Sequence, residues 1–562
     1  MKVKILILSG FCLLLCSLVG HAATGGTISG TIKGPDGQPF RAAFIRAVNA
    51  QTRMTMTVLS DNQGKYFTDK LPPGSYQVRV SAIGFKGDPS SADNVKVEDG
   101  KVVPLNFSMQ KSQVQWSQLN MYQAGTLIPE GRGKGVFLQE CFGCHALGKI
   151  GAVGRRDVDG WKDALELMRQ VKVFDAKPDV EKTVTEYLAS VLGPDSPTPT
   201  SPAMLPEYQK IKQERDYFKD DSLNIVYVDY EVTGMPTDRP GTGKPDKDGN
   251  IWLEIPGGTA KLDPETAKVT TYFLPEVARP GIHEVLPTSD GSVWLTVTGQ
   301  NALARLDVRT GKFDPIYIDN AQNSKYNQNK PVQKEPNDPF PNLPVPEGGQ
   351  GGEGRSHTAV VDHQGNLWVS GRPLKKFDTE TKKYTFFNDV PDTYGIDVDK
   401  VGNVWFAEFN SRDHQEIGMV DVKSNKVTKY HPDGGFTPRR LKVDSQGNIW
   451  VGDYFGGTLT RFDPKTKTFK AFKIPGPMPT PYGVGIDHND NVWYASMYTD
   501  VIGRLDPKSG TFTEYPTPYG EKHTRDLFED AQGRIWYGAQ PYFKVGYVHL
   551  RTNSAGPMAE AR

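Results

Sequence analysis

Gln446-Gly-Asn-Ile-Trp450 is one copy of the phrase that decides the fold of this chain. It reads as a tight turn, in which glycine supplies a positive φ, followed by β residues and a tryptophan. Self-similarity of this kind indicates a repeat architecture. The other copies are Asp248–Trp252, Asp290–Trp294, Gln364–Trp368, Val401–Trp405, Asn489–Trp493 and Gln532–Trp536.

The spacing of these phrases predicts the fold class. Successive tryptophans lie 42, 74, 37, 45, 43 and 43 residues apart, and a four-stranded unit of about 40–45 residues is typical of a propeller blade. We therefore predict a seven-bladed β-propeller over residues 222–551. Its last unit lacks an outer strand, which Asn224–Tyr230 is well placed to supply. The long gap contains an insertion, Asp319–Gly354, that fits a lid, a docking surface or disordered decoration.

The blade phrase, with following strands such as Ile502–Pro507, resembles the streptogramin lyase (virginiamycin B lyase) family. The resemblance implies elimination at the ester of a cyclic depsipeptide, with a general-base histidine and Mg²⁺ held by glutamates. Tyr482 stands where that family has a histidine, and Gln540 stands where it has a second Mg²⁺ glutamate. Glutamine brings no charge to a hard cation. His523 could act as the base, although Arg525 takes the register position, so His523 and Arg525 are the candidate catalytic residues.

A second candidate site follows from counting. The residue eleven positions before each tryptophan begins the innermost strand of a blade and should face the central mouth. A ring of donors and aromatic faces suits an anionic or aromatic small molecule; the alternative is a solvated rim. The ring positions are Gly241, His283, His357, Tyr394, Arg439, Tyr482 and Arg525. A metal could also bind elsewhere on this face, at Glu254, Glu284, Glu408 or Asp453.

Cys141-Phe-Gly-Cys144-His145 spells C-x-x-C-H, the attachment sequence of a c-type haem. A zinc half-site would want more cysteine or histidine ligands, and residues 116–200 offer only His145 beyond the two cysteines. A redox dithiol would need a βαβ context. We predict one covalent haem c, with His145 as an iron ligand.

Helical periodicity surrounds this motif, at residues 131–140, 160–168 and 180–191. The order resembles a class I cytochrome c over residues 116–195, in which a first helix ends at the haem motif and the last helix packs across it. Met168 is the methionine between those helices and is the predicted sixth ligand, a pairing that suits electron transfer. A Pro-rich linker follows over residues 196–221.

The N-terminal part predicts export and a small β module. Residues 1–22 read as a cleaved signal peptide, which favours a periplasmic address without a transmembrane anchor. Residues 25–111 contain about seven short strands with turns such as Asp61–Gly64. They resemble carboxypeptidase regulatory-like domains, which are β-sandwiches, and a spacer or docking role is expected. The fold class is thus mainly β and multidomain, with one small helical domain.

Composition narrows the function. The chain has 66 Lys and Arg against 66 Asp and Glu, which gives no support for nucleic-acid binding. We favour haem-based electron transfer with a periplasmic donor or acceptor, acting on a small molecule bound at the propeller. The alternatives are a Mg²⁺-dependent elimination lyase with an accessory haem domain, and a non-catalytic binding scaffold.

Overall fold

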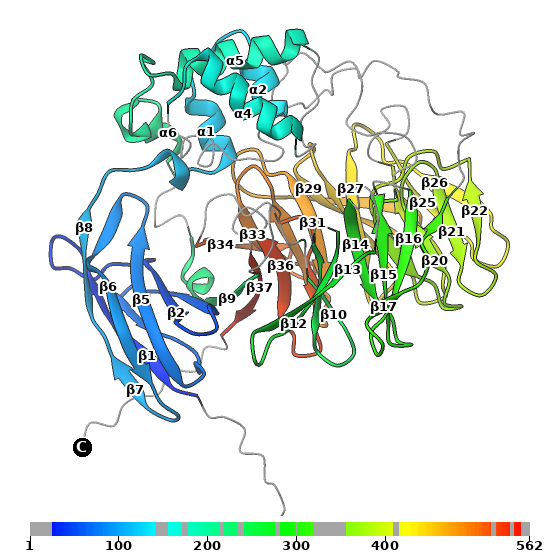
Figure 1. Ribbon diagram of the computed structural model, residues 1–562, viewed down its shortest axis with the longest axis horizontal. Coiled ribbons are helices and arrows are strands. Elements are labelled where there is room, and N and C mark those ends of the chain that lie inside the picture. Colours follow the sequence, from blue (N-terminus) through cyan, green and yellow to red (C-terminus); the bar gives the residue numbers. More distant parts are fainter. Residues whose placement is uncertain are drawn as a thin grey trace, which may run out of the picture.

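The computed structural model describes residues 25–140, 155–170, 178–212, 218–232, 241, 243–255, 257–275, 281–298, 301–319, 356–408, 415–518, 524–539 and 544–551. A β-sandwich lies beside a ring of blades, and a group of helices lies above both (Figure 1). The predicted signal peptide, the haem motif and most of the insertion lie outside the described residues.

The ring consists of seven blades, counted over the described residues, as the tryptophan repeat predicts. Blade 1 holds β10 (Lys244–Pro245), β11 (Ile251–Ile255), β12 (Gly258–Asp263) and β13 (Lys268–Phe273). Blade 2 holds β14 (Ile282–Pro287), β15 (Ser292–Val297), β16 (Ala302–Asp307), β17 (Lys312–Phe313) and β18 (Tyr317–Ile318). Blade 3 holds β19 (Ala359–Val361), β20 (Leu367–Val369), β21 (Leu374–Asp378) and β22 (Lys383–Phe387).

The remaining blades repeat this order from the inner to the outer strand. Blade 4 holds β23 (Ile396–Val398), β24 (Val404–Ala407), β25 (Ile417–Val420) and β26 (Val427–Tyr430). Blade 5 holds β27 (Pro438–Val443), β28 (Ile449–Asp453), β29 (Thr458–Asp463) and β30 (Thr468–Lys473). Blade 6 holds β31 (Pro481–Ile486), β32 (Val492–Ser496), β33 (Val501–Asp506) and β34 (Thr511–Tyr515). Blade 7 holds β35 (Phe528–Glu529), β36 (Ile535–Ala539), β37 (Lys544–Leu550) and β9 (Ile225–Glu231).

The repeated phrase works through an aspartate six residues before the tryptophan. In blade 5, Asp444 Oδ1 accepts from the amides of Gln446 and Asn448 at 2.9 and 2.8 Å, which closes the turn, where Gly447 has a φ of 84°. Asp444 Oδ2 accepts from Trp450 Nε1 at 2.9 Å. One carboxylate therefore fixes both the turn and the buried indole. Blades 1, 3, 4, 6 and 7 repeat this bond, while blade 2 has Thr288 in that place.

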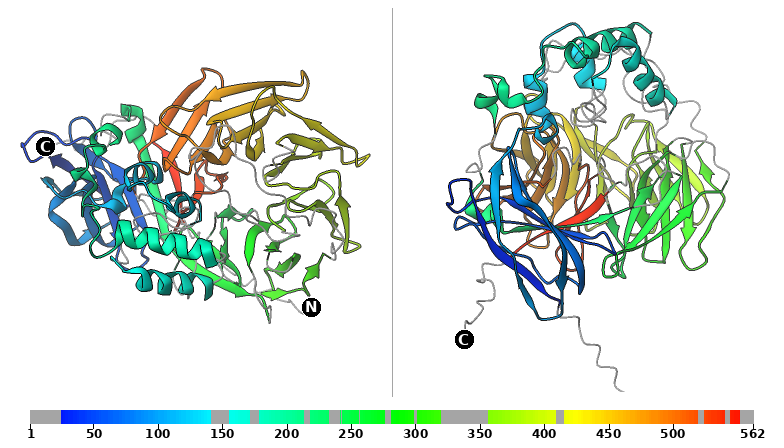
Figure 2. Two further views of the ribbon diagram at one scale, coloured as in Figure 1. Left: turned by 90° about the horizontal axis from the view of Figure 1, so that it is seen from above. Right: turned by 60° about the vertical axis from the view of Figure 1, so that its left-hand side comes forward.

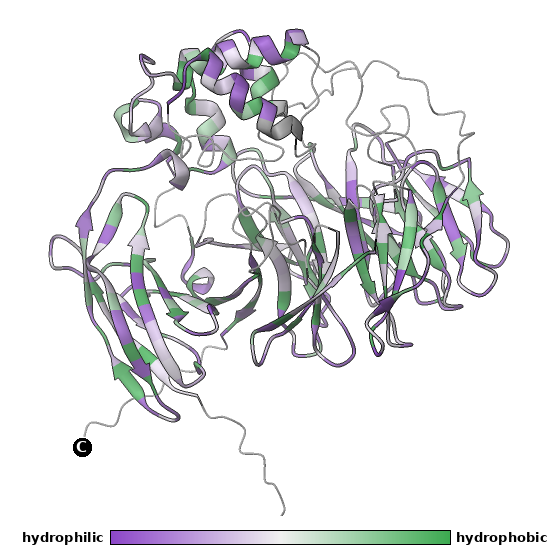
Figure 3. Ribbon diagram, in the orientation of Figure 1, coloured by the Kyte–Doolittle hydropathy of each residue, from purple (hydrophilic) through white to green (hydrophobic). Residues whose placement is uncertain are grey.

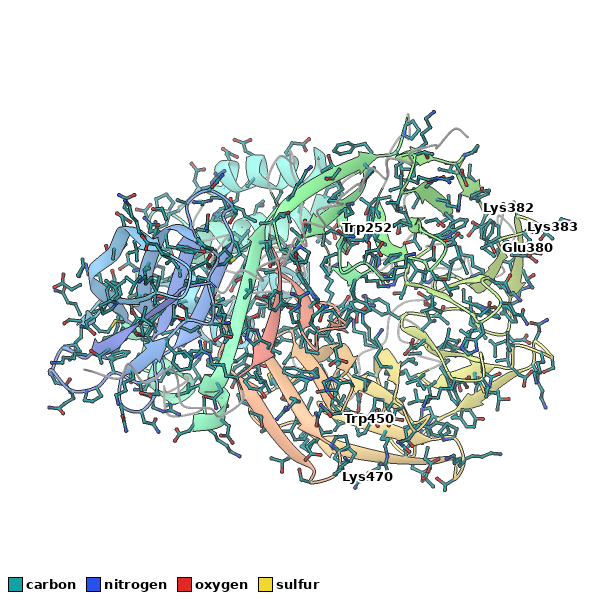
Figure 4. The ribbon with its side chains drawn as sticks, turned by 90° about the horizontal axis from the view of Figure 1, so that it is seen from below. Trp252, Glu380, Lys382, Lys383, Trp450 and Lys470 are labelled. Carbon is teal, nitrogen blue, oxygen red and sulfur yellow. The ribbon has the colours of Figure 1, made fainter. Side chains whose placement is uncertain are left out.

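The tryptophans fill the spaces between neighbouring blades. Trp252 packs against blade 2 and Trp450 against blade 6. They lie on different sides of the ring, whereas Lys382 and Lys383 lie at its outer edge (Figure 4). Both tryptophans are at most 1 % exposed. Hydrophobic and hydrophilic residues alternate along many of the strands, as half-buried sheets require (Figure 3).

The ring closes as the sequence predicts. Strand β9 pairs antiparallel with β37 from Lys544↔Glu231 to Leu550↔Ile225, so an N-terminal strand completes the C-terminal blade. The Tyr537 hydroxyl in β36 donates to Asp229 of β9 at 2.6 Å.

The N-terminal module has eight strands where about seven were expected. They are β1 (Thr27–Lys33), β2 (Phe44–Asn49), β3 (Thr55–Leu59), β4 (Lys65–Phe67), β5 (Gly74–Ala82), β6 (Phe85–Val97), β7 (Val102–Pro104) and β8 (Phe107–Lys111). Ile28, Ile45, Val78 and Phe107 lie in its core. The sandwich-like module predicted from the sequence is confirmed.

This module is joined to the propeller through its backbone. Strand β3 pairs antiparallel with β9, with Met56 opposite Val228, so that the sandwich sheet and blade 7 form one twelve-stranded sheet. Val228, Trp536 and Val545 belong to the same apolar core as the sandwich. A further contact is Asp69, which accepts from His549 Nε2 at 2.5 Å and from Arg551 Nε at 2.6 Å. We call these contacts together, the β3–β9 pairing, the shared apolar core and the bonds of Asp69, the sandwich junction.

The described helices are η1 (Trp116–Gln118), α1 (Met121–Leu127), α2 (Lys134–Glu140), α4 (Val158–Gln170), α5 (Pro178–Leu192), η2 (Pro202–Met204), α6 (Tyr208–Ile211) and η4 (Asp220–Asn224). Three of them, α2, α4 and α5, form where helical periodicity predicts them, whereas the others were not predicted, and η2 and α6 lie within the segment expected to be a Pro-rich linker. Val184, Leu188 and Val191, at helical spacing within residues 180–191, are buried along one face of α5. Near the start of α2, a Cβ at Gly133 would lie 2.7 Å from the Thr183 carbonyl oxygen and 2.8 Å from Tyr187 Cβ. Helices α2 and α5 therefore cross closely, which a side chain at position 133 would prevent.

The helices rest on one side of the propeller, next to the sandwich (Figure 2). The Tyr122 amide donates to the Tyr498 carbonyl at 2.9 Å, and Asn120 Nδ2 donates to the Thr499 carbonyl at 3.2 Å. The helical core also continues into Tyr454 of the propeller. We call this contact the helical junction. None of the helices in the described part of the chain is both long and apolar enough to cross a membrane.

Candidate functional site

Three of the ring positions lie where the innermost strand of a blade begins irregularly. The pairing register shifts between Ile282 and Glu284 in β14, between Pro438 and Leu441 in β27, and between Pro481 and Gly483 in β31. A bulge of this kind re-aims the side chains next to it. His283, Arg439 and Tyr482 all occupy these shifts, so three ring residues are turned towards the mouth by the same local device.

Histidine and tyrosine rings meet on one side of the mouth. The ring centroids of His283 and His357 are 3.5 Å apart, and those of His357 and Tyr394 are 4.3 Å apart. His357 Nδ1 lies 2.9 Å from the Thr358 hydroxyl. Burial, followed by the charges of His283 and the nearby arginines, holds the pKa of His357 well below its usual range. The His357 imidazole is therefore neutral at pH 7.

Arginine and tyrosine side chains interleave on the other side. The Arg439 guanidinium lies 3.7 Å from the ring centroid of Tyr482, 4.4 Å from that of Tyr454 and 5.0 Å from that of Tyr394. Such contacts are attractive because the ring face is electron-rich. The next residue, Arg440, is 5 % exposed and donates to Asp526 at 3.0 Å. Cation–π contacts of Arg439 and the ion pair between Arg440 and Asp526 thus stabilise this part of the mouth.

Tyr394 and Tyr482 share a short hydrogen bond between their hydroxyl oxygens. Burial alone would raise the pKa of Tyr482, but the charges of Arg439, Arg525 and Arg440 and the bond from Tyr394 outweigh burial and lower it to about 7. Burial and the neighbouring Tyr482 raise the pKa of Tyr394. Of the two phenols, Tyr482 ionises first.

The acidic side of the mouth is built around Glu254. A Cβ at Gly241 would overlap the Glu254 carboxyl, so glycine at this ring position leaves room for a glutamate from β11. Burial, followed by the charge of Glu284, raises the pKa of Glu254 to about 8. Glu284 itself forms a buried ion pair of 2.6 Å with Lys244. Glu254 is therefore mainly protonated at pH 7.

A cavity of about 20 Å³ lies between these two sides. This volume holds about one water molecule. The charged and polar residues that line the cavity are Glu254, His283, Glu284, Arg440, Arg525 and Asp526.

The predicted ring is therefore brought together, but it is not a solvated rim. Tyr482, Tyr394 and His357 are 2, 8 and 9 % exposed. Sequence reasoning missed Arg440, Tyr454 and Asp526. Pro438 could have pointed to Arg440, because proline cannot donate to the ladder and often marks an irregular strand start.

Other predicted positions give a mixed outcome. His523 and Gln540 lie outside the described residues, while Arg525 lines the cavity as the ring predicts. Glu408 lies far round the ring and pairs with Lys429 at 2.9 Å, and Asp453 accepts from Thr437. Among the described residues no group of three or more His, Cys, Asp or Glu side chains could hold a metal ion.

The predicted haem residues are only partly placed. Cys141, Cys144 and His145 lie outside the described residues, directly after α2. Met168 falls on α4, although its side chain is not described. Arg155, which precedes α4, donates to the Ser196 carbonyl at 2.9 Å, beyond the end of α5.

Comparisons with known proteins match two parts of the chain. Residues 27–110 match the carboxypeptidase regulatory-like domain, and residues 353–555 match the virginiamycin B lyase family. Neither match covers the helical region. The sequence has no significant match among curated proteins.

Two solved lyase structures are similar to part of this chain. Virginiamycin B lyase from Staphylococcus aureus is 18 % identical over 58 % of this chain and 100 % of its own, with a TM-score of 0.47. A streptogramin B lyase is 18 % identical over 59 % of this chain and 100 % of its own, with a TM-score of 0.48. The chain thus joins a carboxypeptidase regulatory-like domain to a propeller similar to that of the virginiamycin B lyase family.

Proposed function

We propose that this chain is an exported, periplasmic monohaem c-type cytochrome that exchanges electrons with a small molecule or redox partner at the propeller mouth. One observation carries the proposal. The apolar core of the helices, which includes Phe137 of α2 just before the C-x-x-C-H motif, belongs to one cluster with Tyr394, Tyr454 and Tyr482 of the mouth. A redox group attached after α2 would then stand close to the candidate ligand site.

Features of the described helices fit a haem. Helix α2 ends at Glu140, directly before Cys141. The close crossing of α2 and α5 brings the rings of Phe137 and Tyr187 to 5.9 Å. Trp161 Nε1 is buried and has no hydrogen-bond acceptor among the described residues, and a propionate of the bound group would supply one. We place this haem domain at residues 116–195.

Each residue has a defined task in the proposal. Cys141 and Cys144 would hold the haem through thioether bonds, and His145 and Met168 would ligate its iron. The haem supplies one-electron chemistry when bound. The propeller residues bind and orient the partner, and the covalent link keeps the electron carrier at high effective concentration beside the mouth.

The test is spectroscopic. The purified periplasmic protein should show a low-spin haem, and Met168→Ala should abolish the methionine–iron charge-transfer band. Met204→Ala is the matched control, because Met204 is 68 % exposed. If the band survives in Met168→Ala, Met168 is not the ligand; if neither protein binds haem, the proposal fails. A screen of small reductants for haem reduction, repeated with Arg440→Ala, then tests the mouth.

The family match to residues 353–555 favours a second candidate, elimination on a cyclic depsipeptide. It requires His523 as the base and Mg²⁺ near Gln540. Incubation of a streptogramin B with the protein and Mg²⁺ decides this point, because a linear product supports the lyase and its absence rejects it.

A further inference from the structure

The mouth contains a buried acid–base pair to which the proposed electron transfer gives no task. Tyr482 is 2 % exposed and its hydroxyl is bonded to that of Tyr394. The Arg439 guanidinium stacks on the Tyr482 ring at 3.7 Å, and that of Arg440 lies 5.8 Å from the same centroid. Two phenols therefore meet inside a cluster of permanent cations.

We propose that Tyr394 and Tyr482 form a phenol–phenolate pair that gains and loses one proton around neutral pH, and that a small anion in the adjacent cavity makes Tyr482 take up that proton. The mouth would then carry an internal phenolate that gives up its charge when an external anion arrives. This inference goes beyond the proposed function, and neither the phenol pair nor its response to an anion requires the haem.

Charges on every neighbouring element bear on this pair. Arg439 and Arg440 approach from β27, and Arg525 and Asp526 approach from the segment before β35. On the acidic side, Glu284 is held by Lys244, and Glu254 is mainly protonated at pH 7. His283 lies beyond the neutral His357. The helices contribute apolar side chains such as Leu119 and Met121. Cations thus dominate around the two phenols, and cations favour the phenolate.

The two tyrosines around Arg439 behave differently, which provides an internal comparison. The pKa of Tyr482 is lowered to about 7, as described above. Burial raises the pKa of Tyr454 to about 12, although Arg439 acts in the opposite direction. Tyr454 donates to Met497 Sδ at 3.4 Å rather than to a second phenol. Tyr454 is therefore a matched control within the same cluster.

Arg440 links the phenols to the cavity. Its guanidinium faces Tyr482, and the same side chain lines the cavity of about 20 Å³. Its Nε is buried and has no hydrogen-bond partner among the described residues. A cavity of this size admits a water molecule or an anion of similar size. Chloride or the head of a carboxylate would compete with the phenolate for the same guanidiniums.

Linkage fixes the sign of the coupling. An anion near Arg440 and Arg525 offsets the positive charge that stabilises the phenolate, so it raises the pKa of Tyr482. By reciprocity, protonation of Tyr482 strengthens anion binding by the same factor. Anion affinity should therefore rise as the pH falls through about 7.

The first experiment tests the phenol pair alone. Ultraviolet difference spectroscopy of the full-length protein should detect one tyrosinate with a midpoint near pH 7. Tyr482→Phe should remove this transition and Tyr454→Phe should keep it. If Tyr482→Phe does not fold, Tyr394→Phe should instead raise the midpoint by about one unit, because it removes a hydrogen bond to the phenolate. A protein without any tyrosinate below about pH 9 would overturn the proposal.

The second experiment tests the anion with formate as the probe. At pH 7, formate should reduce the tyrosinate signal and take up a fraction of a proton per chain, whereas a bulky sulfonate at equal ionic strength should not. Formate binding without proton uptake, or no formate binding, would overturn the coupling. Neither readout needs electron transfer, so a chain that lacks haem but shows both results contradicts the proposed function and supports this inference.

Discussion

The sandwich and the helices both rest on the propeller, but they are attached in different ways. At the sandwich junction, β3 continues the hydrogen-bonded sheet of blade 7, and one apolar core crosses the boundary. At the helical junction, apolar residues of α1 belong to the same cluster as the tyrosines of the mouth, and two hydrogen bonds join the start of α1 to the loop that contains Tyr498 and Thr499. The first contact builds the ring, whereas the second brings the helices to the candidate site.

This difference has a physical reason. Strand β9 closes the propeller, and its outer edge would otherwise present unpaired backbone groups. Pairing with β3 satisfies these groups, so the N-terminal module is structurally part of blade 7. The helices cover aromatic side chains instead, and such a contact can transmit a change of charge or ligand without opening the ring.

The largest expected effect is at the sandwich junction. Trp536→Ala removes a fully buried indole from the core that the sandwich shares with blade 7. The expected loss is about 3–5 kcal/mol of unfolding free energy, measured by urea denaturation, together with faster amide exchange in β3.

Trp294→Ala is the matched control. Trp294 is 4 % exposed and packs between blades 2 and 3, away from the sandwich. A similar overall loss is expected, but β3 should keep its protection. Equal deprotection of β3 in both variants would contradict the shared core.

The next largest effect is on the pH dependence of stability, which should differ between a carboxyl of the mouth and one at the sandwich junction. The folded-state pKa of Glu254 is about 8, above its ordinary 4.5, so the folded state holds this proton more tightly than the unfolded chain. The contribution of Glu254 should therefore lower stability as the pH rises from about 4.5 to about 8. Glu254→Gln should remove about 2 kcal/mol of this fall, allowing for partial exposure. An unchanged stability profile would show that Glu254 is ionised throughout.

Asp69 at the sandwich junction should behave in the opposite way. Burial alone would raise its pKa, but the hydrogen bond from His549 and the charge of Arg551 lower it. Its contribution is present above the unfolded pKa of 3.8 and is lost as the pH falls through the lower folded value. Asp69→Asn should cost about 1–2 kcal/mol at pH 7. The deficit should shrink in acid, and a deficit that persists in acid would contradict this account.

The smallest effect concerns the helical junction. Asn120 accepts from the Gln123 amide at 2.9 Å at the start of α1 and donates to Thr499. Asn120→Ala should cost about 1 kcal/mol and increase proteolysis within the helices. Asn62→Ala is the control: Asn62 of the sandwich donates to Asp220, just before β9, at 2.6 Å, so its loss should leave α1 to α5 protected. Equal cleavage in both variants would count against a separate helical junction.

The sequence predicts local features well and non-local ones poorly. The turn and tryptophan phrase predicted seven blades, because each phrase fixes its own unit, and the missing outer strand pointed to Asn224–Tyr230. The pairing of β3 with β9 joins strands that are far apart in the chain, and no periodicity reports on it. Counting back from the tryptophans identified the ring residues but could not predict that they are buried. The burial of Tyr394 and Tyr482 involves helices from another part of the chain.

Bulges explain what counting missed at the mouth. A regular strand would turn Arg439 and Arg440 to opposite faces. The register shift between Pro438 and Leu441 lets both reach the tyrosines. Counting also missed Glu254. Its carboxyl occupies the space that a side chain at the ring position Gly241 would fill, and the sequence spacing does not indicate this.

Mass spectrometry of the intact exported protein shows whether a redox group is bound covalently beside the mouth. The account predicts a chain heavier than its polypeptide by one haem, with the added mass on the peptide that contains Cys141 and Cys144. Cys141→Ala with Cys144→Ala should return the mass of the bare polypeptide. An unmodified mass in the wild-type protein, matured where c-type haem is attached, would contradict the account.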